Sequence, residues 1–227
     1  MIQMHTTVLQ KEETGELGRT SECFHSLLSS LSLTDSDTDR HLRTIGFTSC
    51  LPSEGVSTIA INTAVAASSV NDQRVLLVDG NWNNPSLDRS FDLCASPGLA
   101  ECLHSNVDPR PWIQATRFRN LSALVAGECV TDPYVGCGST HQLSELIESV
   151  TAMFDTVIFD VAPVGDSDVA MPLLSSLDGI VLVVEADRVS RHLAQRVVQR
   201  FERAGVRLLG IALNKPRRLP KWISRMN

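Results

Sequence analysis

Short apolar runs alternate with longer amphipathic segments along most of the chain, from residue 44 to residue 213. The runs are rich in Val, Ile and Leu and mostly lack polar alternation, which is typical of parallel strands covered by helices on both faces. The predicted strands are Thr44–Thr48, Arg74–Val78, Leu121–Val125, Thr156–Phe159, Gly179–Val184 and Leu208–Leu213. The predicted helices are Ser57–Ser69, Gln142–Met153 and Ser190–Ala204. This order predicts an α/β fold with a doubly wound, mostly parallel sheet and helices on both faces.

The two ends of the chain differ from this pattern. Residues 1–20 mix charged and polar side chains, and we expect them to form a flexible N-terminal arm. Residues 21–31 repeat apolar side chains at steps of three and four, which predicts a short docking helix. These side chains are Phe24, Leu27, Leu28 and Leu31. We therefore expect a single domain over residues 21–214, including this helix, followed by a basic tail over residues 215–227.

Composition and charge restrict the classes of function. The 227 residues are 43% hydrophobic and carry a formal net charge of −6, which argues against a nucleic-acid partner. No apolar stretch approaches the roughly 18 residues of a membrane span, and no secretory signal is recognisable, so we expect a cytoplasmic protein. The six cysteines have no disulfide-type or metal-type spacing and favour reduced thiols.

Three turns that follow predicted strands carry candidate chemistry. The turn over residues 49–58 enters a helix at Gly55 and Ser57, and the unpaired N–H groups of a helix N-terminus can cradle phosphate. Ser57 could instead merely cap the helix. Asp79 and Asp160 each follow a buried strand, where a carboxylate can hold Mg²⁺ beside a nucleotide. Ligands of doubly wound sheets bind at this end of the strands.

The three turns together resemble the motifs of one family. Residues 52–58 read Pro-Ser-Glu-Gly-Val-Ser-Thr, and the phosphate loop of the bacterial tyrosine kinases of capsule and exopolysaccharide synthesis reads Pro-Gly-Glu-Gly-Lys-Ser-Thr. Residues 79–85 are similar to the family's Asp-x-Asp-Leu-Arg-x-Pro motif, and residues 160–163 to its Asp-x-Pro-Pro motif. The likeness covers roughly residues 21–214. The family is related to septum-positioning and plasmid-partitioning ATPases, so the resemblance implies a P-loop NTPase-like fold.

The resemblance also implies ligands, site residues and a partner. It implies that the site binds ATP or ADP with Mg²⁺, and that the partner is the cytoplasmic segment of a membrane polysaccharide chain-length regulator. The implied nucleotide-binding residues are Glu54, Gly55, Ser57, Thr58 and Asn214. The implied metal ligands are Ser57, Asp79 and Asp160, of which the two aspartates would be catalytic in an active enzyme.

The sequence departs from the family pattern at phosphate-facing and metal-facing positions. The loop lysine is Val56, the second acid of the second motif is Asn81, and the arginine of that motif is Asn83. The lysine neutralises phosphate charge during transfer, and loss of one such contact typically costs about 10² to 10³ in rate. We also expect the Val56 side chain to lie where the phosphates would lie. The resemblance thus predicts a catalytically impaired relative, a pseudokinase.

The lysine and tyrosine content supports this prediction. The chain has three lysines, Lys11, Lys215 and Lys221, so residues 12–214 contain none that could replace the loop lysine. Family members are phosphorylated on tyrosines of the C-terminal tail, whereas Tyr134 is the only tyrosine of this chain.

Two alternatives remain open. An active ATPase or tyrosine kinase could use another cation, such as Arg188 at the end of the fifth predicted strand. A membrane-positioning protein could work through residues 215–227, which combine five basic and no acidic side chains with interleaved apolar ones, in peripheral contact with the inner face of the membrane. Because Pro216 and Pro220 interrupt any helix there, docking of the tail on the acidic body or on a partner is an equal expectation.

Overall fold

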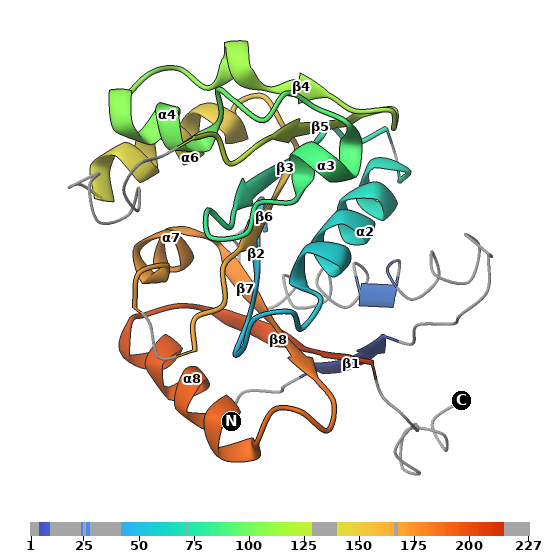
Figure 1. Cartoon of the computed structure of the whole chain (residues 1–227), viewed down its shortest axis with the longest axis vertical. Helices are drawn as coiled ribbons and strands as arrows, with labels where there is room; N and C mark the ends of the chain where they lie inside the picture. The colour runs from blue at the N-terminus through green and yellow to red at the C-terminus, as the bar shows by residue number, and fades with distance from the viewer. Residues whose placement is uncertain are drawn as a thin grey trace.

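A computed structural model describes residues 5–9, 24, 26–27, 42–70, 72–128, 140–165 and 168–215, of which 5–9 by their backbone alone. The described strands are β1 (His5–Leu9), β2 (Thr44–Ser49), β3 (Val75–Gly80), β4 (Gln114–Ala115), β5 (Leu121–Leu124), β6 (Thr156–Val161), β7 (Gly179–Glu185) and β8 (Leu208–Asn214). They form one sheet in the order β1-β8-β7-β2-β6-β3-β5-β4 (Figure 1). Every neighbouring pair is parallel except β4 and β5. The predicted fold class is confirmed.

Helices cover both faces of this sheet and define two apolar clusters. One face carries α2 (Val56–Ser68) and α3 (Leu87–Phe91). The other carries α4 (Leu99–Ser105), α6 (Thr140–Thr151), α7 (Met171–Ser176) and α8 (Arg191–Arg203). Strand β3 shows the division, because Val75 and Leu77 belong to the cluster under α2 whereas Leu76 and Val78 belong to the opposite cluster. Burial on both faces explains why the strands read as continuous apolar runs.

The six predicted strands and three predicted helices are present with shifts of one or two residues at their ends. The short helices α3, α4 and α7 and the one-turn 3₁₀ helix Arg110–Trp112 were not predicted. Segments of three to seven residues are too short to show a helical period.

The structure differs from the flexible arm expected over residues 1–20. Residues His5–Leu9 form the edge strand β1, which pairs in parallel with β8. Thr6, Thr7 and Val8 are β-branched and suit an extended backbone that completes the open edge of β8. The rest of that segment lies outside the described residues.

Only three residues of the docking helix expected over 21–31 are described. Phe24, Ser26 and Leu27 are helical, and Phe24 and Leu27 are buried in the cluster under α2. The tail expected over 215–227 lies outside the described residues except for Lys215. The tail's proposed contacts thus remain predictions.

Helix α8 presents arginines to solvent, with one exception. Arg191, Arg196 and Arg203 are exposed. Arg200 instead pairs with Asp168 and donates to the backbone after β6, so it ties α8 to that loop rather than belonging to a solvated face. Within the described residues, no helix has the length and apolar character needed to cross a membrane.

Candidate functional site

The loop between β2 and α2 lies where the C-terminal ends of β2, β3 and β6 meet. Gly55 ends this loop as the N-cap residue of α2, with φ of 91° in the left-handed region that favours glycine. A Cβ atom at Gly55 would lie 2.3 Å from Nδ2 of Asn214, so the space also requires glycine. Gly55 has no capping side chain, and Ser57 lies inside the helix, so Ser57 does not act as its N-cap. The loop therefore enters a helix whose first N–H groups carry no side-chain cap.

The side chain of Glu54 holds this loop in place. Glu54 is fully buried, and its Oε2 accepts the N–H of Leu51 at 2.7 Å while its Oε1 accepts the N–H of Glu185 at 2.8 Å. The carbonyl of Glu54 accepts a hydrogen bond of 2.7 Å from Nδ2 of Asn214. Glu54 and Asn214, both implied as nucleotide-binding residues, are thus engaged in contacts within the protein. These contacts tie the loop after β2 to the C-terminal ends of β7 and β8.

Asp79, at the end of β3, also holds backbone. Its Oδ1 accepts the N–H of Asn81 at 3.1 Å, and its Oδ2 accepts those of Ser86 and Leu87 at 2.9 and 3.1 Å. Burial raises the pKa of Asp79 although these three hydrogen bonds oppose the rise. Asp79 therefore anchors the segment between β3 and α3.

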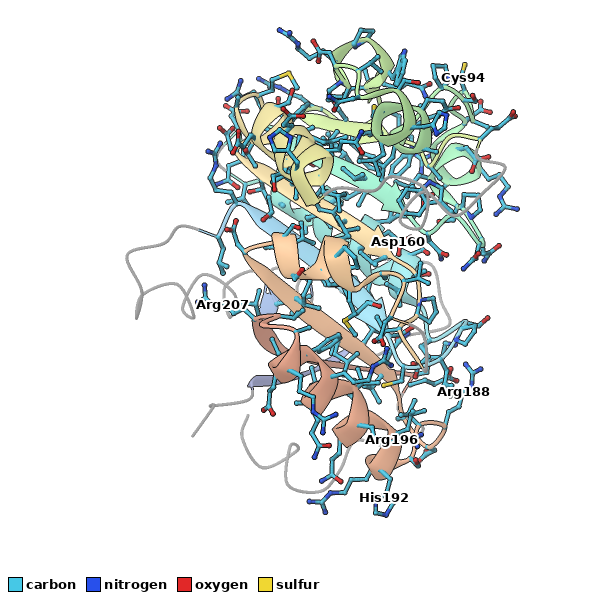
Figure 2. All side chains as sticks on the ribbon, turned by 90° about the vertical axis from the view of Figure 1, so that its left-hand side faces the viewer. Cys94, Asp160, Arg188, His192, Arg196 and Arg207 are labelled. Carbon is cyan, nitrogen blue, oxygen red and sulfur yellow. The ribbon has the colours of Figure 1, made fainter. Side chains whose placement is uncertain are left out.

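Asp160 contrasts with its neighbour. Asp160 is labelled in Figure 2. It lies opposite Asp79 in the register of β3 and β6 and is fully buried. Neither of its carboxylate oxygens has a hydrogen-bond partner among the described residues. Burial and the charge of Asp79 raise its pKa to about 7, and the nearby hydroxyl of Ser57 offsets part of the rise without reaching hydrogen-bonding geometry. A buried carboxylate without a partner favours binding of a cation or a proton.

A magnesium ion fits this arrangement. Asp160 offers carboxylate oxygens and Ser57 a hydroxyl oxygen, and Mg²⁺ prefers hard oxygen ligands of this kind. The described residues contain no group of three or more His, Cys, Asp or Glu side chains that could hold a metal. Phosphate oxygens and water would therefore have to supply most of the coordination, as is usual for Mg²⁺ beside a nucleotide.

Val56 does not lie where the sequence led us to expect it. Its side chain is 7% exposed and belongs to the apolar cluster under α2, together with Phe47 and Ile59. Val56 thus contributes to packing rather than blocking the loop. Ser57 is half-buried and Thr58 is exposed on the next positions of the helix.

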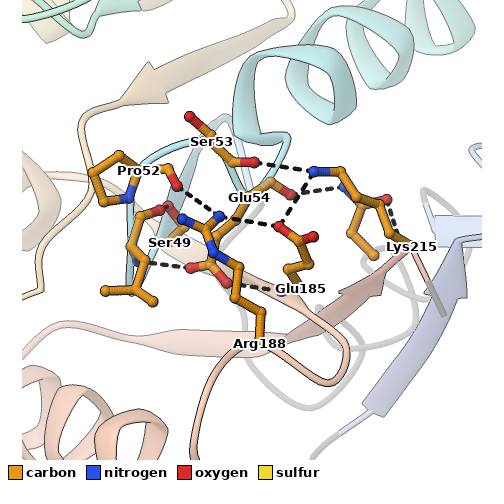
Figure 3. A network of polar contacts seen from close by, with 9 residues as sticks. Ser49, Pro52, Ser53, Glu54, Glu185, Arg188 and Lys215 are labelled. Atoms are coloured by element: carbon orange, nitrogen blue, oxygen red, sulfur yellow. Dashed lines mark hydrogen bonds and ion pairs between the residues drawn. The ribbon is translucent and has the colours of Figure 1, made fainter. Parts of the chain in front are cut away.

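Two cations contact the outside of the loop (Figure 3). Nη1 of Arg188 donates to the carbonyl of Pro52 at 2.8 Å, and Nζ of Lys215 donates to the carbonyl of Ser53 at 3.1 Å. Both cations also reach Oε2 of Glu185, at 3.1 and 3.2 Å respectively. Glu185 therefore lies between the two cations at the rim of the loop.

Known proteins with similar sequences are tyrosine kinases and a polysaccharide transport protein, although no protein-family model matches the chain. Tyrosine-protein kinase CpsD of Streptococcus agalactiae is 26% identical over 198 residues, covering 87% of this chain and 84% of that protein. Tyrosine-protein kinase YwqD of Bacillus subtilis is 29% identical over 176 residues, covering 78% and 73%. The succinoglycan biosynthesis transport protein ExoP of Rhizobium meliloti is 30% identical over 188 residues, covering 76% of this chain but 22% of ExoP.

Solved structures agree with these relatives. The BceF tyrosine kinase domain superposes with a TM-score of 0.75 at 26% identity, over 86% of this chain and 77% of that domain. The chain belongs to the bacterial tyrosine kinase family. The chimerical protein CapA2B2 shares the fold with a TM-score of 0.83 at 24% identity, over 95% and 96% of the two chains. The septum-determining protein MinD of Pyrococcus horikoshii, solved with Mg-ADP, has a TM-score of 0.66 at 23% identity, over 81% and 76%. This chain thus shares its fold with MinD.

The structure brings together most of the kinase-family residues that the sequence singles out. Gly55, Ser57 and Asp160 lie around one loop, while the side chains of Glu54 and Asp79 are occupied by backbone N–H groups. Sequence reasoning missed Glu185. Glu185 is the last residue of β7, and Lys215 directly follows β8. Because β7 and β8 are parallel neighbours that end at the same edge of the sheet, their positions could have indicated the contact between Glu185 and Lys215.

Proposed function

We propose that this chain is a nucleotide-binding but catalytically impaired relative of the bacterial tyrosine kinases that regulates the synthesis or export of an exopolysaccharide or capsule. The observation that carries the proposal is Val56, an apolar side chain packed into the core at the position of the family's lysine. Without that charge the phosphoryl-transfer step loses an electrostatic contact worth about 10² to 10³ in rate. The left-handed Gly55 before Val56 and the uncapped first turn of α2 support phosphate binding by the same loop.

Nucleotide binding is supported by features that do not depend on the lysine. The first turn of α2 offers unpaired N–H groups to phosphate, since no side chain caps it. In the proposed complex Ser57 and Asp160 hold Mg²⁺, while Gly55 and Thr58 lie beside the phosphates. A bound magnesium ion would supply positive charge to the phosphates, and Asp160, with no partner of its own among the described residues, is the side chain able to hold it.

The proposed partner is the cytoplasmic segment of a membrane chain-length regulator, which would place the chain in the cytoplasm at the inner face of the membrane. The relationship to ExoP, a transport protein of succinoglycan biosynthesis, supports a role in polysaccharide export. In this proposal the nucleotide state of the loop controls the contact with the regulator, so binding rather than turnover is the useful property.

The test compares the wild-type chain with a repaired variant. Calorimetric titration with Mg·ADP and Mg·ATP measures binding, and phosphate release measures turnover, for the wild type and for Val56→Lys combined with Asn81→Asp. We expect wild-type binding with negligible turnover. In the repaired variant we expect turnover to rise by about tenfold or more, because the long lysine side chain can extend from the start of α2 out of the core and bring its charge to the phosphates. Val56→Met combined with Asn81→Asp is the matched control, because it keeps an apolar side chain. Turnover by the wild type at rates typical of kinases, about 1–100 s⁻¹, would refute catalytic impairment.

A further inference from the structure

The loop that lacks its lysine has two other cations at its rim. Arg188 comes from the turn after β7 and Lys215 from the residue after β8, and each donates to a loop carbonyl, of Pro52 and Ser53 respectively. Residues 12–214 contain no lysine, and Lys215 is the first lysine after this stretch. Among the described residues, these cations that contact the loop thus come from outside it.

Glu185 holds both cations through a single oxygen. The hydrogen bonds from Arg188 and Lys215 end on its Oε2, at 3.1 and 3.2 Å. Burial, the largest single influence, raises the pKa of Glu185, but the two cations together bring it below its ordinary value. Glu185 is therefore ionised at neutral pH, and the three side chains carry a net charge of about +1.

These contacts are suited to exchange. The side chains of Arg188 and Lys215 are 41% and 42% exposed, and that of Glu185 is 20% exposed. Ion pairs this exposed contribute little to stability, because water screens them and long side chains lose entropy in forming them. A ligand with several negative charges can therefore take both cations from one carboxylate.

Two independent observations indicate that such a ligand belongs at this loop. The first turn of α2 has no side-chain cap, and the buried carboxylate of Asp160 has no hydrogen-bond partner among the described residues. The first favours an anion and the second favours the cation that accompanies it. A nucleoside diphosphate or triphosphate with Mg²⁺ combines both.

We propose that Arg188 and Lys215 supply the positive charge for the phosphates of a bound nucleotide in place of the missing loop lysine, and that Glu185 holds them at the loop until the phosphates displace its carboxylate. This inference rests on the proposed nucleotide binding. It assigns Arg188 and Lys215 a role in binding, and Glu185 a competing role that weakens binding.

The alternative is that the three side chains only hold the shape of the loop. The two roles predict opposite effects of Glu185→Gln. If Glu185 competes with phosphate, its neutralisation frees both cations and strengthens nucleotide binding. If the three side chains are a purely structural tie, Glu185→Gln loosens the loop and weakens binding in the same direction as loss of Arg188 or Lys215.

The experiment is a calorimetric titration of the full chain with Mg·ADP and, separately, with AMP. The variants are Arg188→Met, Lys215→Met, the two combined, and Glu185→Gln. Arg196→Met removes the same charge from an exposed position on α8 and is the matched control. We expect the combined variant to bind Mg·ADP about tenfold or more weakly than Arg196→Met, with a change for AMP of less than about threefold, and Glu185→Gln to bind Mg·ADP about threefold or more tightly.

Results other than these would overturn either the proposed nucleotide binding or the roles of the three side chains alone. A wild-type chain that binds no Mg·ADP refutes the proposed nucleotide binding, and the inference with it. Wild-type binding that is equal in the combined variant and in Arg196→Met overturns the inference alone. Weaker binding by Glu185→Gln assigns the three side chains to holding the loop and also overturns it. If a methionine variant fails to fold, it is replaced by Arg188→Lys or Lys215→Arg, which keep the positive charge. A loss of Mg·ADP binding by these variants as large as that expected for the methionine variants would contradict a role of charge.

Discussion

Replacing Asp160 by asparagine isolates the free-energy cost of the buried carboxylate at the end of β6. Asp160 is fully buried beside Asp79, and neither of its oxygens has a hydrogen-bond partner among the described residues. Asparagine has nearly the same shape and cannot ionise. We therefore expect Asp160→Asn to stabilise the ligand-free protein at pH 8, against the usual rule that substitutions at buried polar positions destabilise.

The magnitude follows from the pKa of about 7 in the folded protein against an ordinary value of 3.8. Between these values the folded state keeps a proton that the unfolded chain releases, so the stability of the wild type falls as the pH rises from about 4 to about 7 and is constant above that. Each pH unit corresponds to about 1.4 kcal/mol, which gives an upper limit of about 4 kcal/mol at pH 8. The asparagine amide is also buried and lowers the observed gain.

The assay is urea unfolding in buffer with a metal chelator, at pH values from 5 to 8.5. The quantity compared is the free energy of unfolding of Asp160→Asn minus that of the wild type. We expect this difference to rise by up to about 1.4 kcal/mol per pH unit until about pH 7 and then to level off. Asp155→Asn is the control, because Asp155 is exposed and its hydrogen bonds from Arg74 lower its pKa, so its loss should destabilise the protein slightly.

Two results would refute this reasoning. A difference that stays constant from pH 5 to pH 8.5 would show that Asp160 titrates at its ordinary pKa, in contact with solvent or a cation. A variant less stable than the wild type at pH 8 would show that the ionised carboxylate makes favourable contacts that outweigh its burial.

Three further outcomes test the site. Mg²⁺ with ADP should raise the unfolding temperature of the wild type more than that of Asp160→Asn, and an equal rise would exclude Asp160 as a metal ligand. Gly55→Ala should lose about 1–3 kcal/mol in urea unfolding, because its φ of 91° strains alanine and its Cβ would displace Asn214 from the carbonyl of Glu54. Glu54→Gln should cost about 1–3 kcal/mol by the same measurement, since its amide group would face one of two backbone donors, and a cost below 0.5 kcal/mol would contradict this anchoring role.

The core of the fold was predictable because burial on both faces leaves a signal that needs no partner. The strand β3 reads as an unbroken apolar run, Val75 to Val78, whichever helix covers it. The elements that were missed depend on distant contacts. Helix α3 is five residues long. The N–H groups of Ser86 and Leu87 at its start donate to the carboxylate of Asp79 at the end of β3. The edge strand His5–Leu9 pairs with β8, which comes from the other end of the chain.

The same distinction applies to the site. Gly55 and Asp160 could be located because each stands next to a strand or helix boundary that the pattern reveals. The sequence does not reveal which carboxylate is free, since Asp79 and Asp160 follow their strands in the same way but differ in their partners. The expectation that the Val56 side chain lies beside the phosphates was wrong, because sequence spacing does not tell which side chains at the start of a helix face the core.

The contacts that shape the loop explain how the family's lysine can be lost without loss of the fold. Glu54, Asn214 and Gly55 set the loop's conformation through partly buried hydrogen bonds and a left-handed backbone, and none of these contacts involves position 56. Exchanging the lysine for a valine that packs under α2 removes charge and adds apolar burial at once. In the proposed complex, the shape of the phosphate-binding loop and the charge that promotes phosphoryl transfer therefore reside in different residues, so one can change while the other persists. A chain of this kind can keep a nucleotide-dependent contact with a partner after phosphoryl transfer has slowed.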